Sequence, residues 1–216
     1  MKKVFASVLA VAAILLTSCG GTDRAHQLKV LNWADYIDED VKAGFEDWYF
    51  QQTGEKVQLV YETFDINETA LTKIEVGHED YDVFCPSEYI IERMLKKDLL
   101  IPIQKDLIPD SIKYFDNISP FVLNKFQQMA PNADVKVSDY TVGYMWGTTG
   151  FIYNPQFVNR EDMISWAAVL DPKFENKILM KDAFRDVYSV LVLYAFADQI
   201  EAGEVTRDEL VRDIWS

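Results

Sequence analysis

The sequence predicts an α/β protein built around a mostly parallel sheet, and three observations lead to this class. From residue 28 onward, short runs rich in β-branched and aromatic residues alternate with amphipathic helical segments. This strand–helix rhythm is typical of βαβ units. The chain has 216 residues, which is enough for one or two domains. Its composition, 49% hydrophobic and 26% charged, is that of an ordinary folded protein.

The first strand and the helix after it follow from local patterns. Residues 28–32 (LKVLN) are apolar enough for a strand. The next apolar residues, Val41, Phe45 and Trp48, are spaced by four and three positions and would share one helix face. Asp38 stands where a helix cap is needed, because its side chain can accept from a backbone N–H of the first turn. A helix that begins after Asp38 is therefore expected.

Two more strands and two more helices continue the alternation. Residues 56–62 (KVQLVYE) predict the second strand, and 67–76 predict a short helix with its apolar residues inward. Residues 81–85 (YDVFC) predict the third strand. Ser87 then stands at the cap position of a helix that continues through Leu95. The order strand, helix, strand, helix predicts a parallel arrangement with the helices on the faces of the sheet.

The second half of the chain changes character twice. Residues 99–139 are rich in Pro, Asn and Asp and predict irregular structure, whereas 140–155 hold glycines and aromatics and predict an extended crossover. A new unit is expected afterwards. It has a short helix over 165–170, a strand over 177–181 (KILMK) and an apolar helix over 185–198.

The N-terminus has the features of an export signal. A positively charged start precedes the apolar run 4–16, which is too short to span a bilayer and fits a signal-peptide core. It ends before Cys19 in a pattern that resembles a bacterial lipobox, so residues 1–18 are expected to be removed and Cys19 to carry lipid. The alternative is an ordinary secretory signal with an incidental cysteine. Residues 19–27 are then a short polar tether.

The charge and the strand ends indicate the class of ligand. A formal net charge of −14 argues against nucleic acid as a partner, because phosphates require a basic surface. The segments after the predicted strands contain aromatics and carboxylates, as in 33–36, 63–65 and 86–89, and no glycine for a phosphate loop. Aromatic faces and carboxylates both attract a cation. A small cationic ligand at the carboxyl ends of the strands is the expectation.

Residues that could perform chemistry are few. Cys85 lies in an apolar run and is expected to be a buried, unreactive thiol. His26 and His78 lack the spacing of metal ligands, so no metal and no cofactor is expected. Asp35 and Glu88 could in principle form the acid pair of a glycoside hydrolase. That reading, a lipid-anchored hydrolase, is an alternative to a binding protein.

Several strings together make the chain resemble the periplasmic spermidine/putrescine-binding proteins of ABC transporters. They occur in the order found in that family: LNWADYID (31–38), ETFDINETALTKI (62–74), YDVFCPSEYIIERM (81–94), VGYMWGTTGFIYN (142–154), SWAAVLDPKFENKILMKD (165–182) and FRDVYSV (184–190). The resemblance implies a type II periplasmic-binding-protein fold, with two lobes and a polyamine held in the cleft between them. It also implies ABC transporter permease subunits as partners and an extracytoplasmic location.

The resemblance places the lobes and the ligand contacts. The first lobe would span 28–139, the crossover 140–150, and a partial second lobe 151–216. Carried over by position, the ligand-binding residues are Trp33, Asp35, Tyr36, Ser87, Glu88, Tyr89, Asp182 and Asp186. A binding protein of this kind performs no reaction on its ligand. A second alternative keeps the fold and changes the ligand to another small cation or a thiamine-like molecule.

The length of the chain completes these expectations. Members of the family are longer than this sequence, so we expect a C-terminally truncated form whose second lobe is incomplete. Such a form is expected to expose apolar surface on the second lobe and to bind polyamine weakly or not at all by itself.

Overall fold

The computed structural model describes residues 23–108, 117–129, 134–207 and 209–210. The predicted signal peptide and Cys19 lie outside the described residues and stay predictions. The chain divides into two units, Met1–Trp146 and Gly147–Ser216, and each is described here by itself. The division falls inside the stretch 140–150. The lobe limits given by the sequence remain predictions.

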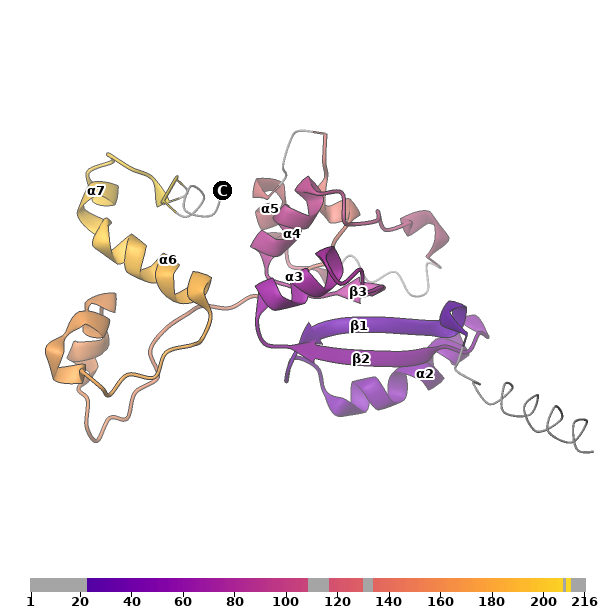
Figure 1. The fold of residues 1–216 in the computed structure, drawn as a ribbon, viewed down its shortest axis with the longest axis horizontal. Helices are drawn as coiled ribbons and strands as arrows, with labels where there is room; N and C mark the ends of the chain where they lie inside the picture. The colour runs from indigo at the N-terminus through magenta and orange to yellow at the C-terminus, as the bar shows by residue number, and fades with distance from the viewer. Residues whose placement is uncertain (1–22, 109–116, 130–133, 208, 211–216) are drawn as a thin grey trace, which may run out of the picture. The chain divides into compact units, whose positions relative to one another are not determined.

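Unit 1 contains a three-stranded parallel sheet, as the strand–helix alternation predicted. Its strands are β1 (Gln27–Trp33), β2 (Gln58–Phe64) and β3 (Val83–Phe84), in the order β2-β1-β3 (Figure 1). The central strand β1 pairs with β2 over its whole length, and Leu31 lies opposite both Glu62 and Phe84. The third strand is shorter than predicted, since only two of the residues 81–85 pair.

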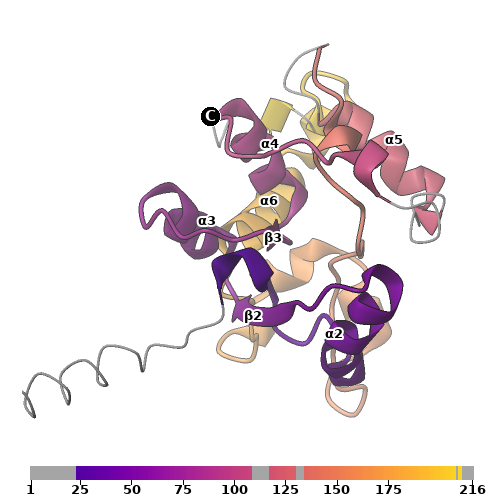
Figure 2. The same ribbon diagram turned by 90° about the vertical axis from the view of Figure 1, so that its right-hand side faces the viewer.

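Helices cover both faces of this sheet. The helix α2 (Glu39–Thr53) lies along one face and α3 (Asn67–Glu75) along the other, with α4 (Glu88–Lys96) beyond α3 (Figures 1 and 2). The predicted cap of α2 is confirmed, because the Asp38 carboxylate accepts from the Asp40 N–H at 2.8 Å. At the other end, Gly54 adopts φ of +77°, which glycine reaches without steric cost.

The core of unit 1 lies on the α3 side of the sheet. Leu31 is completely buried and packs against Phe64 and Ala70, and a second group beside it contains Leu71 and Ile90. Burying a leucine or isoleucine side chain contributes about 1.5–3 kcal/mol, so these contacts hold strands and helices together. The α2 side contrasts with this, because no residue of α2 is buried.

One helix of unit 1 was missed. The prediction of irregular structure over 99–139 is wrong at α5 (Pro120–Gln128), although short 3-10 turns occupy Lys105–Leu107 (η2) and Val137–Asp139 (η5). The signal was present in the sequence: Ser119 accepts from the Phe121 N–H at 3.3 Å, and Pro120 is favoured in a first helical turn.

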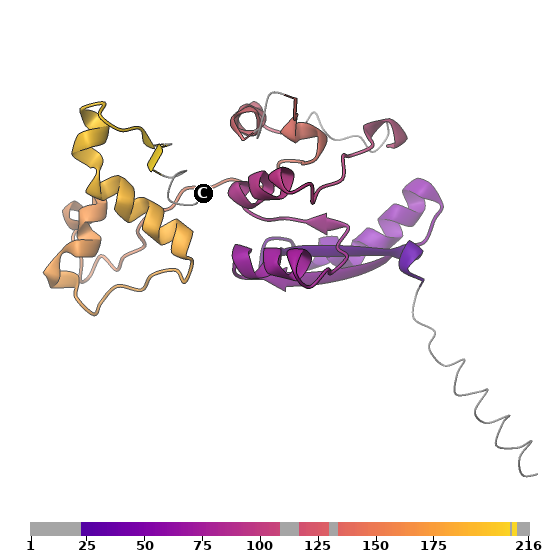
Figure 3. The ribbon, with the colours of Figure 1, turned by 45° about the horizontal axis from the view of Figure 1, so that its top comes forward.

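Unit 2 is helical in the part that the structure describes. Three 3-10 segments, η6 (Arg160–Met163), η7 (Trp166–Leu170) and η8 (Pro172–Phe174), precede α6 (Phe184–Ala195) and α7 (Ala197–Glu201) (Figure 3). The predicted helix over 165–170 is thus a 3-10 segment, and the predicted apolar helix is divided at Phe196.

The predicted strand over 177–181 is wrong. This segment has no strand partner among the described residues of unit 2, and its Leu179 side chain is fully exposed. An apolar run can form a strand only where a neighbouring strand satisfies its backbone groups.

In the described part of the whole chain, no helix combines the length and the apolar character that a membrane crossing requires.

Candidate binding site at the carboxyl edge of the sheet

The carboxyl ends of the three parallel strands meet at one edge of the sheet in unit 1. We call this the carboxyl edge. It consists of the strand ends and the segments that follow them: 32–37 after β1, 64–68 after β2 and 85–89 after β3. Open α/β sheets bind their ligands at this position. Six of the eight predicted ligand residues lie here, from Trp33 to Tyr89.

Aromatic rings form one part of the carboxyl edge. The Trp33 ring lies with its centroid 4.5 Å from that of Phe64 and 6.0 Å from that of Tyr36. Trp33 also packs against the buried core around Leu31, so it supports the fold as well as the edge. Tyr36 is more open, with 41% of its surface exposed. The Tyr144 hydroxyl donates to the Tyr36 carbonyl oxygen.

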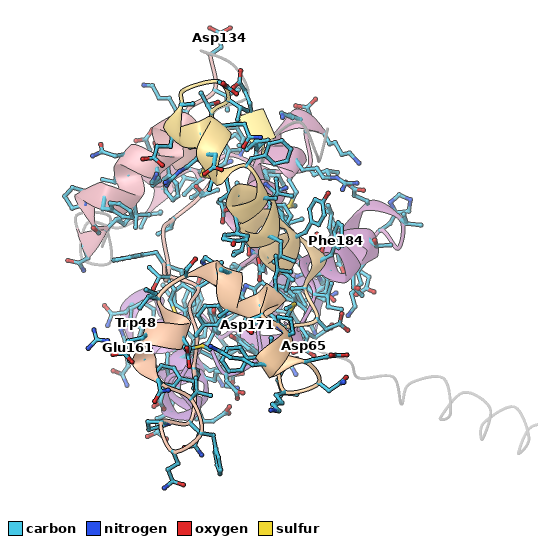
Figure 4. The ribbon with its side chains drawn as sticks, turned by 90° about the vertical axis from the view of Figure 1, so that its left-hand side faces the viewer. Trp48, Asp65, Asp134, Glu161, Asp171 and Phe184 are labelled. Atoms are coloured by element: carbon cyan, nitrogen blue, oxygen red, sulfur yellow. The ribbon has the colours of Figure 1, made fainter. Side chains whose placement is uncertain are left out.

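Carboxylates without ion-pair partners form another part. Asp35, Asp65 (labelled in Figure 4) and Glu88 are exposed, and none of their carboxylates makes an ion pair or side-chain hydrogen bond with a residue that the structure describes. Asp35 adopts φ of +60°, in the left-handed region, which aspartate tolerates better than most residues. These acids are available to a cationic ligand.

The hydroxyls of Ser87 and Tyr89 are held by a residue that the sequence did not single out. The side-chain amide of Asn67, only 5% exposed, donates to Ser87 Oγ at 2.9 Å and to Tyr89 Oη at 3.0 Å. Its carbonyl oxygen accepts from the Ser87 N–H at 3.1 Å. Tyr89 in turn donates to Glu68 Oε1 at 2.9 Å. Asn67 entered the sequence prediction as the first residue of the helix 67–76, with no role at the edge.

A second buried amide, also missed, lies at the end of β1. Asn32 is 5% exposed; its amide donates to Tyr61 Oη at 2.8 Å and its carbonyl oxygen accepts from the Trp33 N–H at 2.8 Å. Tyr144 lies beside this group. The pKa of the Tyr144 phenol is raised. Partial burial is the largest cause, and the neighbouring Tyr61 and Cys85 add smaller contributions. The phenol is therefore a neutral hydrogen-bonding group near neutral pH.

At the opposite, amino edge of the sheet, ion pairs join two basic and two acidic residues. Arg24 Nε lies 2.6 Å from Asp80 and Arg24 Nη2 2.9 Å from Asp82, while Lys29 Nζ lies 2.6 Å from Asp80. We call these four residues the amino-edge clasp. Hydrogen bonds from Lys29 and Arg24 hold the pKa of the Asp80 carboxyl well below its usual range. The charges of the amino-edge clasp are paired with one another, unlike those of Asp35, Asp65 and Glu88 at the carboxyl edge.

The two remaining predicted ligand residues belong to unit 2. Asp186 lies in the first turn of α6 and accepts from Lys181 Nζ at 2.6 Å. Asp182 is exposed, and it does not follow a strand as predicted, because residues 177–181 form none. The structure therefore groups six of the predicted residues at one edge and describes these two with unit 2.

The carboxyl edge combines a thiol with aromatic rings and carboxylates. Cys85 is half-buried, and burial raises the pKa of its thiol, which leaves it protonated near neutral pH. Among the described residues, no group of three or more His, Cys, Asp or Glu side chains could hold a metal ion. Aromatic faces and unpaired carboxylates remain, and they are suited to an ammonium group attached to an apolar chain.

Comparisons with known sequences find similar proteins. Residues 81–215, more than half of the chain, match the family model of the bacterial extracellular solute-binding proteins. The spermidine/putrescine-binding periplasmic protein of Escherichia coli K12 is 30% identical over 192 residues, covering 88% of this chain and 50% of that protein. The corresponding protein of Salmonella typhimurium is 31% identical over 196 residues, covering 88% and 50%.

A solved structure is also similar. A putative spermidine/putrescine ABC transporter protein from Listeria monocytogenes shares 32% sequence identity, with a TM-score of 0.59, over 76% of this chain and 46% of that one. The chain spans about half the length of the curated relatives it matches.

Proposed function

Because the chain belongs to the bacterial extracellular solute-binding proteins, we propose that it captures a polyamine, putrescine or spermidine, for uptake by an ABC transporter. The family consists of transport proteins rather than enzymes, and we infer that the ligand is bound and released unchanged. One structural observation carries the choice of ligand: aromatic rings and unpaired acids meet at the carboxyl edge. Relatives named for spermidine and putrescine binding support the same choice.

Each residue type at the carboxyl edge suits one part of a polyamine. The rings of Trp33 and Tyr36 would contact the methylene chain and the face of an ammonium group, at roughly 0.5–2 kcal/mol for each cation–π contact. Asp35 and Glu88 would accept hydrogen bonds from an ammonium group. Such bonds contribute about 1.5–3 kcal/mol when one partner is charged.

The remaining predicted contacts complete the proposal. Ser87 and Tyr89 would accept hydrogen bonds at the end of β3, and Asp182 and Asp186 remain candidate ligand acids of unit 2. Asp186 would have to exchange its ion pair with Lys181 for the ligand, which is a small cost for an exposed pair. No cofactor is required for this function.

The proposed route to the transporter begins at the N-terminus. Residues 1–18 would direct export, and Cys19 would carry the lipid that holds the protein at the outer side of a bacterial membrane. Permease subunits of an ABC transporter would be its protein partners, and the membrane would be contacted through the lipid alone.

Calorimetric titration tests the ligand directly. The protein that carries this chain is titrated with putrescine, with spermidine and with glutamate as an anionic control. Saturable heat with at least one polyamine and none with glutamate is the expected result. Absence of heat with both polyamines, from protein shown to be folded by its melting transition, would overturn the proposal.

A further inference from the structure

We propose that Asn67 is the positioning residue of the carboxyl edge, because its buried side-chain amide fixes the hydroxyls of Ser87 and Tyr89 for ligand binding. The inference rests on the proposed function, since it assumes that these hydroxyls meet a ligand. Asn67 is the first residue of α3, after β2, whereas Ser87 is the cap residue of α4 and Tyr89 lies in its first turn, after β3. One amide therefore ties together two segments of the edge that come from different strands.

The direction of each hydrogen bond around Asn67 is determined by one backbone group. The Ser87 N–H can only donate, so the atom that faces it at 3.1 Å must be the carbonyl oxygen of the amide. The amide nitrogen then faces the two hydroxyls, with one hydrogen for Ser87 Oγ and one for Tyr89 Oη. Asn67 has no other arrangement that satisfies all three partners.

This direction decides what Tyr89 can offer to a ligand. The phenol oxygen accepts from Asn67, and its own proton goes to Glu68 Oε1 at 2.9 Å. Because its proton is directed to Glu68, the Tyr89 phenol presents no proton to a ligand, which suits a ligand that itself brings N–H donors. A primary ammonium group brings three such donors. The hydrogen-bond chain from Ser87 N–H to Glu68 thus prepares the edge for an amine.

The behaviour of Ser87 supports a role beyond helix capping. Ser87 occupies the cap position of α4, yet its side chain makes no cap hydrogen bond. Serine at that position usually accepts from an N–H of the first turn. Here its hydroxyl accepts from Asn67 instead. The Asn67 amide is 95% removed from solvent, so its three bonds are not exchanged with water.

A double-mutant cycle tests the positioning role. Asn67→Ala is compared in two backgrounds, the unchanged protein and the variant with Ser87→Ala and Tyr89→Phe, by calorimetry with putrescine. We expect Asn67→Ala to weaken binding about tenfold in the first background and less than about twofold in the second, because its partners are then absent. Equal losses in both backgrounds, or no loss in the first, would contradict the inference. Glu55→Gln, after α2 and away from the edge, is the matched control and should leave affinity unchanged.

A second measurement needs no ligand and separates this inference from the proposed function. With tyrosine labelled at Cζ, the carbon resonance of Tyr89, assigned with Tyr89→Phe, should shift in Asn67→Ala. An unchanged resonance overturns the positioning role whatever the protein binds. A shifted resonance in a protein that binds no polyamine leaves the positioning of the hydroxyls intact and removes the proposed ligand. If Asn67→Ala does not fold, Asn67→Ser is the milder variant, since its short side chain cannot reach both hydroxyls, and the same two results are expected.

Discussion

The two edges of the unit 1 sheet use acidic residues in opposite ways. At the amino edge, Asp80 and Asp82 are ion-paired with Arg24 and Lys29. At the carboxyl edge, acids such as Asp35 stand beside aromatic rings without an ion-pair partner among the described residues. The net charge of −14 belongs to the whole chain and does not distinguish one edge from the other. The positions of the basic side chains do, since they pair with the acids of the amino edge and leave acids such as Asp35 for the proposed ligand.

The largest effect is expected from the strand that joins the two edges. Leu31 lies in the middle of β1 and is completely buried. Leu31→Ala should lower the free energy of unfolding by about 2–5 kcal/mol, because it removes methyl groups from a packed core and leaves a cavity. Urea denaturation followed by fluorescence measures this. Leu28→Ala, at a half-buried position of the same strand, is the control and should cost less; equal losses would mean that the core is not centred on Leu31.

Trp33 contributes to both fold and edge, so two substitutions are needed to separate its roles. Trp33→Ala should weaken putrescine binding about 30-fold, equivalent to about 2 kcal/mol, and also lower the melting temperature because Trp33 packs beside Leu31. Trp33→Leu keeps an apolar side chain there without an aromatic face. It should show most of the affinity loss and less of the melting loss. Normal affinity in folded Trp33→Leu would reduce Trp33 to core packing.

Asp35 tests the unpaired acids of the carboxyl edge. Asp35→Asn removes the charge and keeps a residue that tolerates φ of +60°, so we expect about tenfold weaker putrescine binding and an unchanged melting temperature. Asp35→Ala should lose similar affinity and also melt earlier, because alanine is strained at this φ. Calorimetry and thermal melting measure the two effects. Equal melting temperatures for the two variants would show that the left-handed conformation is not retained.

The smallest effect is expected at the amino-edge clasp, and it depends on pH. The pKa of Asp80 is held low in the folded protein by Lys29 and Arg24. The clasp therefore stabilises the fold fully above the unfolded value of about 4 and loses this contribution as the pH falls below it. The melting temperature of Asp80→Asn should lie slightly below that of the unchanged protein at pH 7, and the difference should begin to shrink as the pH falls below about 4 toward the lowered pKa of the folded state. Putrescine affinity at pH 7 should stay within about twofold.

Asp65→Asn supplies the counterpart at the other edge. Its carboxylate makes no ion pair with a described residue, so this variant should leave the melting temperature at pH 7 almost unchanged. A melting loss as large as that of Asp80→Asn would remove the distinction between the edges.

The parts of the fold that periodicity predicted are those with a local cause. The strands β1 and β2 and the helices α2, α3 and α4 follow from apolar spacing together with caps such as Asp38. The strand predicted over 177–181 failed because pairing depends on a partner strand, which an apolar run cannot supply by itself. The helix α5 was missed although Ser119 and Pro120 mark its start.

The candidate site was predictable to a similar degree. The aromatic and acidic residues after the strands, such as Trp33 and Asp35, stand out because the same residue types recur after several predicted strands. Asn32 and Asn67 do not, because the sequence alone does not show that these two asparagines are buried. Their roles follow from partners distant in the sequence, Tyr61 for Asn32 and Ser87 for Asn67, which only the fold brings near.

The amino-edge clasp also determines how unit 1 bears a mechanical load. A force that pulls on the chain before Arg24 reaches the sheet at the beginning of β1, the central strand. Arg24 first transfers part of it to Asp80 and Asp82, next to β3. When the opposing force is applied through the chain that follows β2, the rest acts along β1 and shears its seven register pairs with β2 together rather than opening them one after another. In single-molecule pulling, Arg24→Ala should lower the force of the first rupture and leave the shear-resistant sheet event in place.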